Sequence, residues 1–317
     1  MIFNNDPISV CTVTLSPSLD YHLTFDSLHC GTLNRSSSEH FTVGGKGINV
    51  TRALHKLGIK SLATGFLAGF TGDKISSALS PDVPTDFIFL QEGITRVNVK
   101  LHHGSETEIN ANGPYISPEN FEELKNKLEI LESGDILVLS GSISPSLPVT
   151  AYADIMERVK DKNIRVALDT TGESLTNALP YRPFLIKPNK TELEELFAAK
   201  IDGIGDTLFY ARKLREKGAR NILVTFSEKG AILLSEDNKL YYTTAPSGIV
   251  HSTIGSGDSS VAGFIAAALQ EDVFDPSHAL ALAVATGSAC AFTDDLADRD
   301  KIYSLLNEIN VTEFSEA

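Results

Sequence analysis

Ile136-Leu-Val-Leu-Ser140 is the first of four short apolar runs that decide the fold of this 317-residue chain. The others are Val166-Ala-Leu-Asp169, Phe184-Leu-Ile-Lys187 and Ile222-Leu-Val-Thr225, and each of the first three precedes a helical pattern. Strands that alternate with helices form a parallel sheet, and strands buried on both faces are continuously apolar. The sequence therefore predicts an α/β fold: a mostly parallel central sheet with helices on both faces.

Further elements of the same domain follow from apolar periodicity and from turn residues. An apolar, β-branched opening run and a second run after the first helix predict two more buried strands. Near the carboxyl end, Asp237-Asn238 predicts the turn of a hairpin, and three helical patterns follow Gly257. We predict strands at 8–15, 61–67, 231–234 and 240–243, and helices at 48–57, 259–269, 277–292 and 299–309.

A second kind of strand occurs between residues 86 and 110. Val97, Val99 and Leu101 alternate with polar residues, a period of two that is typical of a half-exposed strand. We expect 86–90 and 95–102 to pair antiparallel across a turn at Glu92-Gly93. Together with the polar stretch 16–43, the region 86–110 is expected to form a small β-sheet lid on a single domain that spans 1–317.

Composition excludes several classes of function. The chain carries 41 acidic and 27 basic residues, a net charge of −14, whereas nucleic-acid binders present basic surfaces. Three scattered cysteines do not suit a disulfide framework or a zinc site. The amino-terminal residues lack the pattern of a secretory signal, and apolar runs are too short to span a membrane. We expect a cytoplasmic protein that binds neither nucleic acid nor membranes.

Thr253-Ile-Gly-Ser-Gly-Asp258 is the segment with the clearest chemical meaning. It precedes an apolar helical run, and the unpaired N–H groups and dipole of a helix start favour a bound anion. From these residues alone, a phosphate site and a glycine-rich turn capped by Asp258 remain equally good interpretations. Neither the Walker pattern nor the dinucleotide fingerprint fits, because Gly45-Lys46 is followed by Gly47 and the other glycines are wrongly spaced.

Two motifs in sequence order give a more specific resemblance. Gly44-Gly-Lys-Gly-Ile-Asn49 and Thr253-Ile-Gly-Ser-Gly-Asp258 resemble the ribokinase-like carbohydrate kinases, in particular the phosphosugar branch of 1-phosphofructokinases and tagatose-6-phosphate kinases. Supporting matches are Thr14-Leu-Ser-Pro-Ser-Leu-Asp20, Thr95-Arg-Val-Asn-Val-Lys100, Ser140-Gly-Ser-Ile143, Asp169-Thr-Thr-Gly172 and Lys187-Pro-Asn-Lys-Thr-Glu192. The chain departs from this resemblance at Ser227 and Ala68, where family members often have glycine.

The resemblance implies roles for individual residues. Asp258 matches the base that deprotonates the sugar hydroxyl, and Asn189 and Glu192 match the pair that organises Mg²⁺, often through water. The anion hole corresponds to Gly255, Ser256 and Gly257. Substrate-binding positions are Asp20, Gly44, Gly45, Asn49 and Ser140, with Lys46, Arg96 and Lys100 as partners of the substrate's phosphate. ATP-binding positions are Lys187, Asn189, Thr225, Ser227, Gly230, Gly255 and Gly257.

The expected reaction is ATP-dependent phosphorylation of a ketohexose phosphate. Fructose 1-phosphate, which would give fructose 1,6-bisphosphate, is the preferred substrate, since Thr95 to Lys100 resembles that branch. Tagatose 6-phosphate and fructose 6-phosphate remain alternatives, because a ketofuranose is nearly symmetric end to end and Ser256 also suits the tagatose branch. A kinase for an unphosphorylated sugar or nucleoside, and a catalytically silent regulator, are further alternatives. The resemblance also implies a homodimer formed through the lid.

Overall fold

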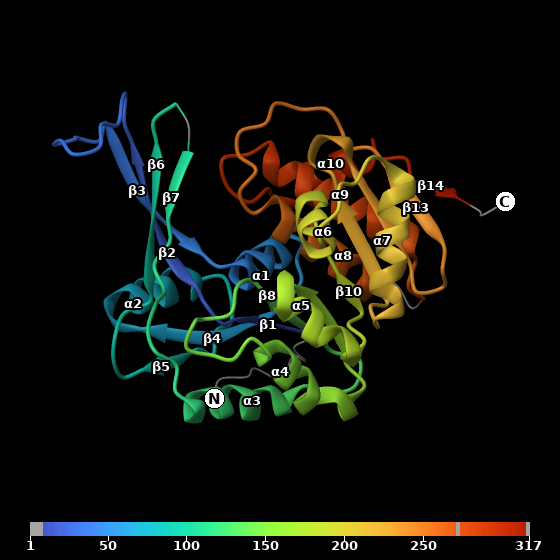
Figure 1. Ribbon diagram of the computed structural model, residues 1–317, viewed down its shortest axis with the longest axis horizontal. Coiled ribbons are helices and arrows are strands. Elements are labelled where there is room, and N and C mark those ends of the chain that lie inside the picture. Colours follow the sequence, from blue (N-terminus) through green and yellow to red (C-terminus); the bar gives the residue numbers. More distant parts are fainter. Residues whose placement is uncertain (1–8, 105, 271–272, 315–317) are drawn as a thin grey trace.

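The computed structural model describes residues 9–104, 106–270 and 273–314, which form a large sheet with helices on both faces (Figure 1). From β5 to β11 every pair of neighbouring strands is parallel, and three antiparallel strands extend the other edge. The predicted α/β class is confirmed. In spatial order the strands are β14 (Thr312–Phe314), β13 (Leu240–Thr243), β12 (Ala231–Leu234), β11 (Asn221–Thr225), β10 (Leu185–Ile186), β9 (Arg165–Asp169), β8 (Ile136–Ser140), β1 (Val10–Thr14), β4 (Leu62–Ala68) and β5 (Ile88–Leu90).

Each central strand contributes side chains to two cores, one on either face of the sheet. In β8, Leu137 and Leu139 lie in one core, whereas Ile136 and Val138 lie in the other. This is why the strand sequences are continuously apolar rather than alternating. One face is covered by α3 (Pro118–Lys127), α4 (Ala151–Val159), α5 (Gly172–Ala178), α6 (Lys190–Phe197) and α7 (Ile204–Glu216), and the other by α1 (Lys46–Lys56), α2 (Gly69–Leu79), α8 (Ser256–Gln270), α9 (Pro276–Ala291) and α10 (Arg299–Leu306).

Most boundaries lie within a few residues of those expected. The hairpin of β12 and β13 agrees with the prediction at both ends, and β1 lies inside the predicted 8–15, although residue 8 is outside the described ranges. Helix α8 begins at Ser256, three residues earlier than expected, because Gly257 belongs to its first turn. Short 3₁₀ turns complete the fold at Leu128–Ile130, Lys160–Lys162, Leu179–Tyr181 and Ser227–Lys229. Within the described ranges, no helix has the length and apolarity to cross a membrane.

A smaller four-stranded sheet stands away from one end of the large one (Figure 1). Its central pair, β2 and β6, is parallel, and both outer pairs are antiparallel. Side chains of β2 and β6 that face the large sheet are polar and buried, Asp20 and Asn98 among them. The spatial order is β3 (Ser38–Gly44), β2 (Ser18–Thr24), β6 (Arg96–His102) and β7 (Glu106–Ile109).

The expected antiparallel pairing of 86–90 with 95–102 is wrong. Strand β5 belongs to the large sheet, where it pairs parallel with β4, and β6 belongs to the small one. Ile88 and Leu90 are both buried in the main core, which no hairpin arm projecting into solvent would allow. The chain turns at Gly93, whose φ is 82°, and Thr95 N donates to Ala68 O before β6 leaves for the small sheet.

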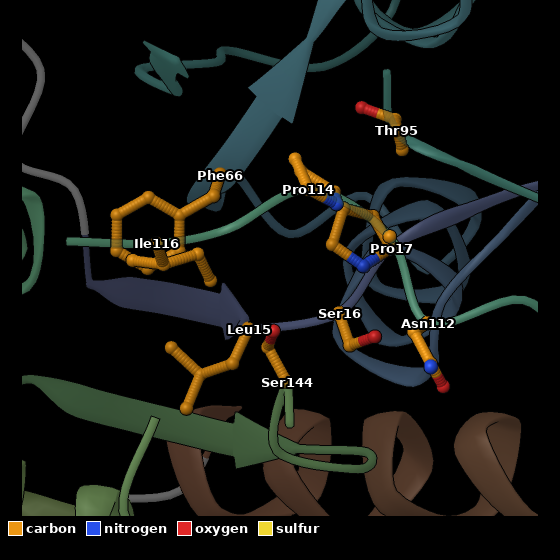
Figure 2. A pocket seen from close by; sticks show the side chains of 10 residues that line it. Leu15, Ser16, Pro17, Phe66, Thr95, Asn112, Pro114, Ile116 and Ser144 are labelled. Atoms are coloured by element: carbon orange, nitrogen blue, oxygen red, sulfur yellow. The ribbon is translucent and has the colours of Figure 1, made fainter. Parts of the chain in front are cut away.

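The joint between the two sheets is closely packed. Figure 2 shows residues of the segments 15–17 and 112–116 around a small cavity, which Phe66, Thr95 and Ser144 also line. Its volume is about 10 Å³, which is close to the least space that one water molecule requires. Apolar side chains such as Leu15 and Ile116 therefore fix the position from which the small sheet extends.

Candidate active site

A cavity of about 450 Å³ lies between the carboxyl ends of the central strands and the small sheet. Thr14 at the end of β1 and Gly141 after β8 lie at its floor, where the strand order reverses between β4 and β8. Such a reversal creates the crevice where open α/β sheets bind ligands, and this volume suits a small molecule. Nine residues singled out from the sequence line it: Asp20, Gly45, Lys46, Asn49, Arg96, Lys100, Glu192, Gly255 and Asp258.

Asp258 lies in the first turn of α8 and is 94% buried, with 6% of its surface exposed. Asn49 Nδ2, from α1, donates a hydrogen bond to Asp258 Oδ2 over 2.8 Å. Burial raises the pKa of Asp258 to about 7, and the charge of Asp169 acts in the same direction, against the Asn49 hydrogen bond and two lysines. A carboxylate with a pKa near neutrality is matched to proton abstraction at physiological pH.

Two lysines lie close to the start of α8. Lys187, which follows β10 and is 5% exposed, places Nζ 3.6 Å from Asp169 Oδ1. A Cβ atom on Gly257 would approach Lys187 Nζ to 3.1 Å, so glycine gives the ammonium room beside the helix end. Lys46 Nζ lies 3.4 Å from Asp169 Oδ2. Two ammonium groups and a helix N-terminus together favour an anion at this point.

The charge on Lys46 depends on its carboxylate neighbours. Burial lowers the pKa of Lys46, but the negative charges of Asp169, Asp258 and Glu192 outweigh that effect and raise it above its ordinary value. Lys46 is thus a stable cation at neutral pH, and it is held toward the strand ends.

Asp20 lies on β2 and lines the cavity from the side of the small sheet. Ser18 Oγ and Asn98 Nδ2 both donate to Asp20 Oδ1, over 2.6 and 3.0 Å, which fixes the carboxylate. A Cβ atom on Gly44 would lie 2.7 Å from Asp20 Oδ2, so only glycine fits against this oxygen. A fixed carboxylate can accept hydrogen bonds from neutral hydroxyl groups, which is what binding of a sugar ring requires.

Positive charge at the far side of the cavity comes from strand β6. The Arg96 guanidinium donates to Ser16 O over 3.0 Å and to Pro17 O over 3.4 Å. Lys100 Nζ pairs with Glu108 Oε1 at 2.5 Å. Lys46 and Arg96 therefore line one cavity but contact different groups, the first at the strand ends and the second at the joint between the sheets.

Comparison with known proteins decides the family. The sequence pattern of the pfkB family carbohydrate kinases matches residues 17–297. The chain belongs to the pfkB family of carbohydrate kinases. It is 41% identical to the 1-phosphofructokinase of Bacillus subtilis and 32% identical to a tagatose-6-phosphate kinase of Staphylococcus epidermidis, each over 96% of this chain and 99% of the relative. The structure of phosphofructokinase-2 from Escherichia coli in complex with fructose-6-phosphate superposes with a TM-score of 0.86 at 27% identity, covering 95% of this chain and 99% of that one.

The chain is therefore a phosphotransferase that acts on a carbohydrate, and kinases of the pfkB family use ATP.

Asn189 and Glu192 lie at the start of α6 in this pfkB kinase. They form a capping box at the start of α6: Asn189 Oδ1 accepts from Glu192 N, and Glu192 Oε2 accepts from Asn189 N. Glu192 Oε1 remains directed toward Lys46 Nζ, 3.9 Å away. Of the two, only Glu192 lines the cavity.

Mg²⁺ is bound in kinases by one or two carboxylates together with water and phosphate oxygens. Glu192 Oε1 fits that requirement, whereas the Asn189 side chain is engaged as the helix cap. No group of three or more potential ligands from His, Cys, Asp and Glu gathers within the described residues, so this site would rely on phosphate and water for its remaining ligands.

Other residues singled out from the sequence lie outside the cavity lining. Ser140 is fully buried at the end of β8, and its two successors, Gly141 and Ser142, line the cavity instead. Ser227 adopts φ of 51°, in the left-handed region that favours glycine, which agrees with its place in a glycine position of the family pattern. The remaining residues outside the lining are Gly44, Lys187, Asn189, Thr225, Gly230, Ser256 and Gly257.

Several lining residues were not singled out from the sequence. Asn98, Glu108 and Asn110 line the cavity from the small sheet and the segment after it. Polar residues on an alternating strand are normally assigned to the solvent side, so periodicity gave no reason to select them. For Asn98, the alternation with Val97 and Val99 does indicate that it shares a face with Arg96 and Lys100, and that was the available signal.

Proposed function

We propose that this kinase transfers the γ-phosphoryl group of ATP to the C6 hydroxyl of fructose 1-phosphate, giving fructose 1,6-bisphosphate. One observation carries the proposal. At one side the cavity is lined by the proposed base, Asp258, and by Gly255, and Lys187 lies beside the start of α8 although it is outside the lining. At the other side the cavity is lined by separate cations, Arg96 and Lys100. A sugar that already bears a phosphate needs both sides, whereas a neutral sugar gives the second pair of cations little to bind.

In the proposed reaction, Asp258 accepts the proton of the attacking hydroxyl. The N–H groups at Gly255, Ser256 and Gly257, with the helix dipole, stabilise negative charge on the phosphoryl group in transfer. Lys187 lies beside this helix start, and the contacts of Lys46 with Asp169 and Glu192 favour a place for it there too.

ATP phosphates extend toward the residues after β10 and β11. Mg²⁺, when bound near Glu192, neutralises charge on these phosphates. Asp20 and Asn49, with the glycines at 44 and 45, bind the sugar hydroxyls in this arrangement.

The substrate's identity has two close alternatives. Tagatose 6-phosphate and fructose 6-phosphate would place a hydroxyl and a phosphate at the same two sides of the cavity with the sugar reversed. A relative named as a tagatose-6-phosphate kinase is 32% identical. The higher identity to a 1-phosphofructokinase, 41%, supports fructose 1-phosphate. A catalytically silent regulator is disfavoured, because a buried carboxylate with a raised pKa destabilises the fold and binding alone does not need it.

The small sheet also supports a proposed homodimer. Its face turned away from the cavity carries Tyr21 and Phe41, whose rings stack with centroids 4.3 Å apart, and Ile109 at the edge. Phe41 and Ile109 are 50% and 57% exposed, which a second copy of the chain would cover. A cytoplasmic location agrees with the three cysteines, all of which are free thiols.

A coupled assay of ADP release over a panel of sugars tests the function. Fructose 1-phosphate should give the highest kcat/KM, with tagatose 6-phosphate and fructose 6-phosphate behind it and free fructose far lower. Asp258→Asn serves as the inactive control. Preference for a ketohexose 6-phosphate would select the alternative substrate, and preference for a free sugar or nucleoside would reject the phosphosugar assignment.

A further inference from the structure

Lys100 and Glu108 form an ion pair whose two members differ in burial. They are register partners on the antiparallel strands β6 and β7, and both line the cavity. The Lys100 side chain is 8% exposed, whereas that of Glu108 is 43% exposed. Glu108 can therefore rotate into water, whereas the Lys100 side chain is enclosed at the cavity wall.

The free enzyme needs a partner for Lys100. A buried ammonium group without a counter-charge is strongly unfavourable, so an empty site with Lys100 alone would be costly. Glu108 supplies the charge: the hydrogen bond from Lys100 is the largest influence that lowers the pKa of Glu108, which keeps the carboxylate ionised. In this structure the pair is closed, with 2.5 Å between Lys100 Nζ and Glu108 Oε1.

Glu108 also occupies the side of the cavity on which Arg96 and Asn110 lie. An anion that binds Lys100 comes close to the Glu108 carboxylate, and the two negative charges repel at such short range. A neutral hydroxyl group cannot outcompete a carboxylate for the ammonium. A phosphate dianion can, because it carries more charge and three acceptor oxygens.

We propose that Glu108 is a specificity-determining residue, which holds Lys100 in the empty site and releases it only to the phosphate of the substrate. This proposal rests on the proposed function, since it assigns to Lys100 the binding of the phosphate that the substrate already carries. The exchange replaces one counter-ion by another, so a buried charge is paired before and after binding. Sugars without a phosphate leave the pair closed and lose that part of the cavity.

Replacement of Glu108 by glutamine has two linked consequences. The empty enzyme loses stability, because Lys100 then faces a neutral amide. Phosphate binding becomes stronger, because no carboxylate competes or repels. A ligand that binds only the folded protein raises the unfolding temperature according to its affinity, so both effects can be read from one measurement.

The test compares four proteins with the wild type: Glu108→Gln, Lys100→Met, the double variant, and Glu106→Gln as matched control. Glu106 lies two residues before Glu108 on the same strand face, carries the same charge and does not line the cavity. Thermal unfolding is followed with and without inorganic phosphate, and KM is measured for fructose 1-phosphate and for ATP. Glu108→Asp provides a second variant with the charge kept and the reach shortened.

Glu108→Gln should unfold at a lower temperature without phosphate and show a larger phosphate-induced rise than the wild type. Its KM for fructose 1-phosphate should fall by roughly 2- to 5-fold, the range expected when an ion pair with one exposed member is removed. KM for ATP should not change. Glu106→Gln should match the wild type, and the double variant should respond to phosphate like Lys100→Met.

An unchanged or smaller phosphate response in Glu108→Gln would overturn the proposal, because Glu108 would then help Lys100 bind rather than compete for the ammonium. A gain that persists in the double variant would overturn it too, since the effect would not pass through Lys100. Failure of the proposed function looks different: wild-type enzyme would turn over no ketohexose phosphate, while the phosphate-dependent unfolding of the variants still reports on the exchange.

Discussion

Asp258→Asn should make the protein more stable while it removes catalysis. The change is nearly isosteric, and the amide oxygen of the new side chain can still accept the hydrogen bond from Asn49 Nδ2. What disappears is a negative charge in a site with 6% exposure, close to Asp169. The variant therefore separates the chemical role of the carboxylate from its cost to the fold.

The magnitude follows from the pKa. Burial raises the pKa of Asp258 from 3.8 to about 7, so the ionised form is disfavoured in the folded state. At about 1.36 kcal/mol for each pKa unit, full ionisation costs at most about 4 kcal/mol. A raised carboxyl pKa makes stability greatest below the unfolded value and reduces it as pH rises toward 7. The difference in free energy of unfolding between Asp258→Asn and the wild type should thus grow by about 2–3 kcal/mol between pH 5 and pH 8.

Urea unfolding of both proteins between pH 5 and pH 8, without nucleotide, measures this difference. The turnover assay should show a kcat loss of roughly 10²- to 10⁴-fold, the usual contribution of a general base. In the wild type, kcat should fall as pH drops below 7, because protonated Asp258 cannot accept the hydroxyl proton. Parallel stability curves at all pH values would refute the raised pKa, and near-normal turnover would remove Asp258 from the mechanism.

Three further changes probe other parts of the site. Arg96→Ala should raise KM for the phosphosugar by roughly 10- to 150-fold and leave KM for ATP nearly constant, since charge-assisted hydrogen bonds are worth about 1.5–3 kcal/mol. Equal effects on both substrates would contradict this, and Arg96→Lys is the control that keeps the charge. Glu192→Gln keeps the capping box, because an amide oxygen also accepts from Asn189 N, yet it should raise the Mg²⁺ concentration needed for half-maximal rate; an identical Mg²⁺ titration would limit Glu192 to its helix-start role. Ser227→Gly should raise the free energy of unfolding by up to about 1 kcal/mol, because φ of 51° suits glycine better than serine; a lower unfolding temperature would indicate that the hydroxyl makes a stabilising contact.

The large sheet could be predicted because its evidence is local. Runs such as Ile136–Ser140 are apolar at every position, and burial on both faces is the direct cause of that pattern. Strand partners are a different matter, since pairing joins residues far apart in sequence. Strand β5 reads as half-exposed through Phe89, which is 44% exposed, yet Ile88 and Leu90 pack in the main core. Alternation reports exposure and does not identify the neighbouring strand.

The candidate site could be predicted in its charged and glycine-rich parts but not in its contacts. Family motifs led to Asp258, Asn49 and Lys46, which do line one cavity. They could not indicate that Lys46 turns toward Asp169, because that contact joins residues 123 positions apart. Glu108 was missed for the same reason: its importance depends on a register partner, Lys100, and not on its own neighbours in sequence.

One face of the large sheet is covered by helices that are synthesised late, and this order of synthesis has a biological consequence. Strands β1, β8 and β9 emerge from the ribosome before residue 170, but one of their faces is covered by α8 and α9, which begin at Ser256 and Pro276. Until those helices arrive, side chains such as Val10, Val138 and Ala167 lack most of the helical cover of their face of the sheet. A nascent chain thus carries an open apolar surface for most of its synthesis, and such surfaces recruit chaperones and promote aggregation. The helix that carries Asp258, the proposed base, also closes this core, so the proposed site and the cover of the apolar face are completed in the same late step.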